Sequence, residues 1–334
     1  MSSKSTERHL LPALGLFFLA PLVGEFLLGN LPITWLWTLL TLAPLYGGGA
    51  LLIRETARRL KWGWPSMIVL ALAYALIEEA FVTQSLFNPN YVGLRLLDYG
   101  YIPSLGISAW WTTFVLGIHI IWSMAVPIAL MESLTPQARQ TPWLGPLGFI
   151  VTAVVFLIGC ALTFMFQQEP FMASPAQFTV SGVIVVVLIV IAAILGRAKR
   201  EDQRAVSEPL NPLLVAGTAF LLGSVFMSLA LVHDAIPASL NVAGKIAVLL
   251  TGGLLLWNGS RRADWSEGHR FAVAAGLLLV YAWYGFVQIP SVGDTSPSID
   301  AIGNAFFVVG ALLLLGIARK RIQAAGGRTP STGH

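Results

Sequence analysis

Residues 74–91, YALIEEAFVTQSLFNPNY, decide how the chain must fold. Two adjacent carboxylates, Glu78 and Glu79, interrupt a segment that is otherwise apolar enough to cross a bilayer. A charged side chain at such a depth costs at least about 2.5–3.5 kcal/mol, and such side chains face other helices or a water-filled cavity rather than lipid. The stretch therefore predicts a bundle of transmembrane helices with a polar site buried inside it.

The composition also indicates a membrane protein. Of the 334 residues, 56% are hydrophobic and 11% are charged, and the mean hydropathy is +0.75. Soluble domains carry about 25% charged residues, so most of this surface must face lipid. The single cysteine, Cys160, excludes an internal disulfide and a cysteine metal cluster. The net charge of +4 follows from membrane topology and does not indicate nucleic-acid binding.

The hydrophobic pattern predicts an all-α, polytopic transmembrane helix bundle. A spanning helix needs about 20 largely apolar residues. Ten stretches satisfy this requirement, at roughly 10–30, 33–53, 65–87, 109–131, 147–166, 178–196, 212–232, 239–258, 270–290 and 299–318. The first stretch lacks a small-residue cleavage site, so we interpret it as an uncleaved span rather than a signal peptide.

The basic residues lie almost entirely in every second connection. All Lys and Arg residues follow this pattern except Arg95, in an opposite loop, and Lys245, inside a span. Because Lys and Arg are concentrated in cytoplasmic loops, we expect both termini to be cytoplasmic. We expect the chain to lie in the cytoplasmic (inner) membrane of a prokaryote.

The connections divide the chain into parts. We expect a cytoplasmic N-terminus at 1–9, a first part with the polar site at 10–196, a cytoplasmic linker at 197–211, further spans that serve mostly as scaffold at 212–318, and a disordered cytoplasmic tail at 319–334. The loop 88–108 is rich in Tyr and Leu, which suggests a packed cap because apolar loop residues need something to cover them.

Five ionisable residues fall in one layer of the predicted bundle. At about 1.5 Å of rise per residue, their positions along the spans place them between the midplane and the outer half. They are Glu25, Glu78, Glu79, His119 and Lys245. Adjacent helical positions differ by about 100°, so we expect Glu78 and Glu79 to point in different directions, one toward the site and the other toward a group such as Lys245.

Other polar and aromatic residues share helix faces with this layer. Trp122 and Ser123 follow His119 by three and four residues and should form one patch with it. The catalytic candidates are Glu78, Glu79 and His119. The candidates for substrate or ion binding are Glu25, Lys245, Thr83, Trp122, Ser123, Tyr74 and Asn88.

A carboxylate pair beside a histidine can activate water as a general base and then protonate a leaving group. These residues resemble the CPBP (Abi or CAAX-protease-like) intramembrane proteases, which carry E-E-x-x-x-R, F-x-x-x-H and H-x-x-x-N in successive motifs. The chain has Glu78-Glu79 and, in the next span, His119, with Thr83 at the arginine position and no third motif. The resemblance implies an intramembrane endopeptidase in which one glutamate is the base and His119 its partner.

Two other classes of protein fit the same residues. Ten spans, a five-plus-five division and midplane carboxylates suit a proton- or cation-coupled secondary transporter of a small molecule. A non-catalytic membrane receptor or assembly factor is the third alternative. The sequence indicates no particular cofactor. A Zn²⁺ held by Glu and His is geometrically conceivable, but H-E-x-x-H is absent, so we expect no metal. The expected partners are membrane lipids and an unidentified small-molecule or membrane-peptide substrate, without nucleic acid.

Overall fold

A computed structural model describes residues 3–166, 171–198 and 208–326 of the protein. Nine helices in this part of the chain are long and apolar enough to cross a membrane. A further helix, α11 (Glu267–Tyr284), overlaps the predicted ninth span. The predicted all-α polytopic bundle is therefore confirmed.

The helices and strands have the following bounds. The α-helices are α1 (Ser3–Pro21), α2 (Leu39–Leu42), α3 (Gly48–Arg59), α4 (Trp64–Ile77), α5 (Ala109–Ile118), α6 (Val126–Leu134), α7 (Pro146–Met165), α8 (Pro175–Arg197), α9 (Pro212–Leu231), α10 (Ala238–Ser260), α11 and α12 (Pro297–Gly326). The two strands are β1 (Tyr101–Ile102) and β2 (Ile107–Ser108). Four π-helical turns, Leu22–Leu27, Ala43–Gly47, Glu78–Val82 and His119–Ala125, interrupt or extend the first four spans.

Local sequence signals define several helix ends. Proline occupies the first turn of α7, α8 and α9, where its missing N–H is not needed. Ser174 and Gln177 form a capping box at the start of α8, so its first free N–H groups have partners.

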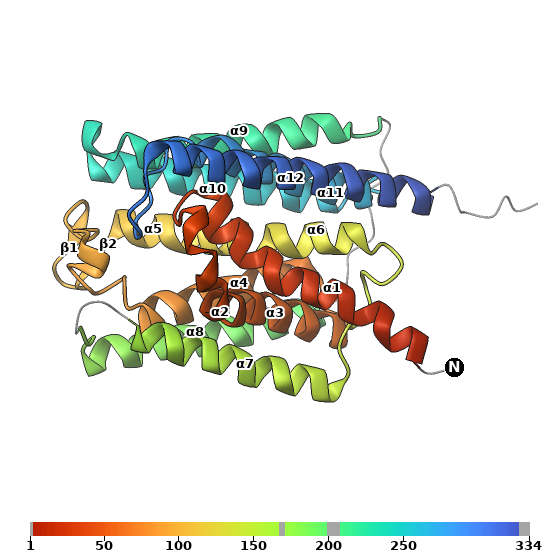
Figure 1. Ribbon diagram of the computed structural model, residues 1–334, viewed down its shortest axis with the longest axis horizontal. Coiled ribbons are helices and arrows are strands. Elements are labelled where there is room, and N and C mark those ends of the chain that lie inside the picture. Colours follow the sequence, from red (N-terminus) through yellow and green to blue (C-terminus); the bar gives the residue numbers. More distant parts are fainter. Residues whose placement is uncertain (1–2, 167–170, 199–207, 327–334) are drawn as a thin grey trace, which may run out of the picture.

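The helices lie side by side in three layers (Figure 1). The second half of the chain, α9–α12, forms one layer; α1, α5 and α6 lie in the middle; and α2–α4, α7 and α8 form the third. Contacts of α6 with both α11 and α12 join the first two layers, while α11 packs on α9 and α4 packs on α8 within their own layers.

Burial separates central spans from peripheral ones. In an 18-residue apolar stretch of each candidate span, 56–67% of the residues are buried in the first four spans and 11–22% in the other five. The exposed residues of α7 and α8 are mainly Val, Ile, Leu and Phe, which is the surface that lipid requires. A polar site on the first four spans is therefore shielded by the rest of the bundle.

The two ends of the bundle are built differently. At the Arg-rich end, the fully buried Arg54 pairs with Glu55 at 2.7 Å and Glu132 at 3.2 Å and lies over the Trp143 ring. At the opposite end, β1 pairs antiparallel with β2 within the loop 88–108. The Tyr99 hydroxyl donates to the Ile236 carbonyl at 2.6 Å and so fastens this loop to the second half of the chain.

Some predicted segments lie partly beyond what the structure describes. Most of the linker 197–211 and the end of the tail, 327–334, are outside the described residues. The predicted tail begins at 319, whereas α12 continues to Gly326.

Candidate functional site

Each of the four central spans carries a π-helical turn where it contributes to the site. Glu25 lies in Leu22–Leu27, Tyr46 in Ala43–Gly47, Glu78 and Glu79 in Glu78–Val82, and His119 and Ser123 in His119–Ala125. A π-helical turn inserts a residue into the helix and is found often at functional sites. The last of these turns ends two residues before Pro127, which has no N–H to donate to the carbonyl of Ser123.

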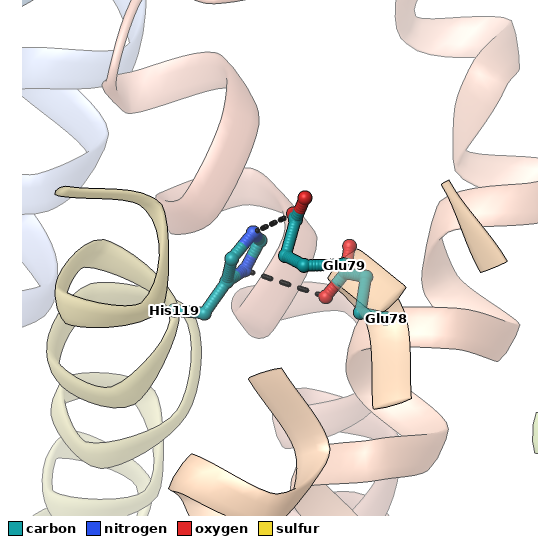
Figure 2. Close-up of side chains that lie close together, drawn as sticks. All are labelled: Glu78, Glu79 and His119. Atoms are coloured by element: carbon teal, nitrogen blue, oxygen red, sulfur yellow. Dashed lines mark hydrogen bonds and ion pairs between the residues drawn. The ribbon is translucent and has the colours of Figure 1, made fainter. Parts of the chain in front are cut away.

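Glu79 and His119 form the closest ion pair of the site (Figure 2). The Nε2 atom of His119 lies 2.7 Å from Oε1 of Glu79, and both side chains are about 5% exposed. The other carboxylate oxygen of Glu79 accepts hydrogen bonds from the hydroxyls of Thr83, at 3.1 Å, and Ser85. Trp111 donates from Nε1 to the Ser85 hydroxyl at 2.9 Å. Glu79 is thus held at both oxygens.

Glu78 approaches the other nitrogen of the same ring (Figure 2). Oε2 of Glu78 lies 3.3 Å from Nδ1 of His119, which also lies 3.2 Å from the Ser123 hydroxyl. Each nitrogen of the ring therefore has a carboxylate oxygen within 3.3 Å, and Nδ1 has the Ser123 hydroxyl as a second polar neighbour.

The expectation that the two glutamates point to different partners is wrong. Both contact His119, and neither pairs with Lys245. The reason is local: the pair begins a π-helical turn, which lowers the angle between successive residues, and His119 presents two nitrogens to two carboxylates.

Glu25 is held by a second set of donors. The Asn30 amide donates to Oε2 at 2.6 Å, and the Tyr46 hydroxyl donates to Oε1. The Tyr46 ring also lies 5.6 Å from the His119 ring, between centroids, so it links the two clusters. Both carboxyl oxygens of Glu25 are therefore fixed in place by neutral donors.

A cavity of about 220 Å³ adjoins these clusters on the side of the loop 88–108. Its polar lining includes Glu25, Glu78, Tyr46, Asn88 and Tyr91. Glu78 is therefore the cavity-facing member of the Glu–Glu–His cluster. Among the described residues, its Oε2 atom has no partner in hydrogen-bond geometry, although the residue is only 1% exposed.

Tyr91, in the loop above the spans, remains a proton donor at ordinary pH. Burial raises the pKa of its phenol, and the nearby carboxylates of Glu79, Glu25 and Glu78 raise that pKa further. The cavity lining thus includes a neutral hydroxyl as well as the carboxylates.

Most of the residues predicted for the site come together. Ser123 and Thr83 contact His119 and Glu79, and Asn88 lines the cavity. The Tyr74 ring lies 6.5 Å from the His119 ring, with its hydroxyl outside hydrogen-bond geometry to any described residue.

Two predicted residues lie elsewhere. Trp122 turns toward α11, where Nε1 donates to the Leu277 carbonyl at 2.7 Å and the ring stacks on Tyr281. Lys245 is fully buried among aromatic rings, with Nζ 4.4 Å from the Trp110 centroid and 4.7 Å from that of Phe114.

Sequence reasoning missed Asn30, Tyr46 and Tyr91. Burying an uncharged polar residue in an apolar span or beside a loop costs little free energy. The sequence alone therefore cannot distinguish site residues of this kind from residues that only pack. One signal was available for Asn30, which follows Glu25 by five residues at the predicted end of the same span.

The cluster could also hold a cation. Glu78, Glu79 and His119 each offer one ligand atom, and these atoms lie within 4.8 Å of one another. Carboxylate oxygen and imidazole nitrogen suit several divalent metals. As the side chains stand, however, the imidazole uses both nitrogens toward the carboxylates.

The fold and site define a multi-pass integral membrane protein with a buried Glu–Glu–His cluster. The chain belongs to an uncharacterized membrane protein family, whose model matches residues 14–325. This match covers all four spans that build the site. Comparisons with curated proteins and with solved structures give no match.

Proposed function

We propose that the protein is an intramembrane hydrolase of amide bonds, with Glu78 as the base that activates water. The observation that carries the proposal is the position of Glu78, which lines the cavity while its Oε2 atom lies 3.3 Å from the His119 ring. A general base must reach both a water molecule and the substrate, and a cavity-facing carboxylate satisfies this requirement.

The proposed roles follow from the contacts. Glu79 binds Nε2 of His119 and fixes the ring, while Nδ1 faces Glu78. This order of carboxylate, imidazole and reacting group follows the logic of catalytic triads, in which the first carboxylate orients the ring and stabilises its charge. Glu79 is a positioning residue in this scheme because it does not line the cavity.

The reaction would proceed in two balanced steps. Water loses one proton to Glu78 as its oxygen bonds to the amide carbon, giving a tetrahedral intermediate. The C–N bond then breaks, and the proton on Glu78 passes to the departing nitrogen, so one amide and one water become one carboxylic acid and one amine. Asn88 and Tyr91 line the same cavity and carry N–H and O–H donors suited to the oxygen of the intermediate.

Resemblance to the CPBP proteases supports the same roles. The shared residues are Glu78, Glu79 and His119, and both glutamates have an oxygen within 3.3 Å of the ring nitrogens of His119, which comes from a different span. In the proposed scheme Thr83, at the arginine position of that family, supports Glu79 through a hydroxyl instead of a charge.

The pattern of Lys and Arg supports an orientation with both termini in the cytoplasm of a prokaryotic cell. The cavity, which includes Asn88 and Tyr91 of the loop 88–108, would then lie on the outer side of the inner membrane. A substrate would be a membrane-embedded peptide or small amide that enters from that side.

The test compares membrane fractions from cells that express the wild-type chain, Glu78→Gln or Asp98→Asn. New peptide termini are labelled and identified by mass spectrometry, and folding is checked by thermal unfolding. Termini that appear with the wild type and Asp98→Asn but not with Glu78→Gln support hydrolysis. Asp98 is an exposed carboxylate in the loop 88–108 and serves as the matched control.

Two results would overturn the proposal. One is an identical set of termini from the wild type and a folded Glu78→Gln variant. The other is an absence of hydrolysis together with substrate-dependent proton movement in proteoliposomes that Glu78→Gln abolishes, which would assign the chain to the secondary transporters instead.

A further inference from the structure

The cavity has more acidic than basic side chains. Three carboxylates, Glu25, Glu78 and Glu79, lie in or beside it, and among the described residues of the site His119 is the one group that can carry a positive charge. No described residue in the cavity lining is Lys or Arg. Buried charges are retained when they are paired, so the site has more anionic groups than it can neutralise by itself.

The individual contacts show which carboxylates lack a partner. Glu79 has the imidazole and two hydroxyls, and Glu25 has the hydroxyl of Tyr46 and the amide of Asn30. These donors to Glu25 are neutral, so they bring no positive charge to it. Glu78 shares the imidazole of His119 with Glu79, which lies closer to it. The Oε2 atom of Glu78 has no hydrogen-bond partner among the described residues.

The cavity also has aromatic walls. Rings of Tyr46, Tyr91 and Trp35 line it together with the two carboxylates. Carboxylates and aromatic faces both attract organic cations, and an aromatic face attracts an ammonium group more strongly when that group is removed from water. The same walls disfavour phosphate or carboxylate groups, because no basic residue among those described would pair with them.

We propose that the cavity selects substrates that carry an ammonium group, which binds between Glu25 and Glu78. Glu25 is then the residue that determines specificity, and Glu78 both contacts the ammonium group and acts on the neighbouring amide. The substrate class is an amide in the membrane with a primary or quaternary amine close to the scissile bond. This inference rests on the proposed hydrolytic function for its catalytic part, but its binding part does not require any turnover.

Binding can be measured without a known substrate. The probe is hexylammonium, compared with hexan-1-ol and hexanoate, which share its chain but are neutral or anionic. Purified protein in lipid nanodiscs is titrated with each probe, and the shift of the unfolding temperature and the heat of binding are recorded. We expect hexylammonium to bind at least tenfold more tightly than hexan-1-ol, and hexanoate not to bind.

Two variants test whether hexylammonium binds in the cavity. Glu25→Gln should weaken hexylammonium binding at least tenfold while leaving the binding of hexan-1-ol unchanged. Asp98→Asn removes a carboxylate from the same end of the bundle and should leave both affinities unchanged, which separates a local contact from the general field of the protein. Equal affinities for hexylammonium and hexan-1-ol, or an unchanged affinity in a folded Glu25→Gln variant, would overturn the proposal.

Other occupants give different results. If Zn²⁺ or Mg²⁺ stabilises the protein and prevents hexylammonium from binding, the cation is a metal held by the Glu–Glu–His cluster, and the ammonium proposal fails. If neither binds and only pH changes stability, a proton balances the charges, and the proposal fails as well.

Failure of the inference differs from failure of the proposed function. Amide cleavage that is equally fast for an amine substrate and its N-acetylated form, but lost in Glu78→Gln, would keep the hydrolase and remove the ammonium site. Tight, Glu25-dependent binding of hexylammonium without any cleavage would keep the ammonium site and remove the hydrolase. If both stand, Glu25→Gln should raise KM at least tenfold for the amine substrate alone, with kcat little changed.

Discussion

The pair formed by Glu79 and His119 predicts a measurable coupling free energy. We consider the variants Glu79→Gln and His119→Asn and the double variant that combines them. Each single change keeps a polar side chain of similar shape but removes one partner of a buried ion pair whose atoms are 2.7 Å apart. Removing one partner of such a pair usually costs about 3–5 kcal/mol, because the other charge stays buried without compensation.

The surrounding contacts lower this figure for the site. After Glu79→Gln, His119 still has Oε2 of Glu78 at 3.3 Å, so we expect a loss near the lower limit, about 3 kcal/mol. After His119→Asn, Glu79 keeps the hydroxyls of Thr83 and Ser85, and we expect a similar loss of about 3 kcal/mol. The double variant removes both charges, so it should cost about 2 kcal/mol less than the sum of the single losses.

The assay is reversible unfolding in mixed detergent micelles, with the free energy of unfolding measured for all four proteins. A control cycle combines Glu79→Gln with Glu267→Gln, since Glu267 pairs with Arg139 and Arg270 at the Arg-rich end. Those two changes should add to within about 0.5 kcal/mol. If the Glu79 and His119 changes add equally well, the two side chains do not form the buried pair described above.

Two further predictions concern packing. In Gly276→Ala the new Cβ would lie 2.2 Å from the Ala216 carbonyl oxygen, which forces α9 and α11 apart. The free energy of unfolding, measured with heat or detergent, should fall by about 1–3 kcal/mol. The control Gly253→Ala has nothing within 4 Å of its Cβ and should change this free energy by less than about 0.5 kcal/mol. Lys245→Met should leave the free energy of unfolding unchanged or raise it. Nζ of Lys245 has no hydrogen-bond partner among the described residues, and the apolar side chain of Met suits the aromatic rings around it. A loss above about 1 kcal/mol would show that the buried amine makes a net stabilising contact.

The sequence predicts the class of protein well because the membrane imposes it. Apolar length sets the spans, and the cost of buried charge singles out the ionisable residues in them. Depth along a helix is a simple product of residue count and rise, so Glu25, Glu78, Glu79 and His119 could be assigned to one layer before any contact was known.

Direction around the bundle could not be predicted in the same way. Lys245 shares the layer, but its helix, α10, packs on α9 and α5, and the side chain meets aromatic rings there. Trp122 is close to His119 in sequence, but its indole turns to α11 for a hydrogen bond and a stacking partner. The direction of each side chain is set by contacts with neighbouring helices, and the positions of those helices depend on the packing of the whole bundle.

The π-helical turns explain why the predicted directions of Glu78 and Glu79 were wrong. An expectation of about 100° between neighbours assumes a regular α-helix, and Glu78 and Glu79 begin a turn that is not one. Three other spans depart from the α-helix at the depth where they supply Glu25, Tyr46 and His119. A wider turn leaves a carbonyl without its usual partner, which is costly in lipid unless other contacts compensate. Four such turns meeting at one cluster therefore indicate that the interactions among these side chains, rather than helix propensity, hold the backbone of the central spans in its shape.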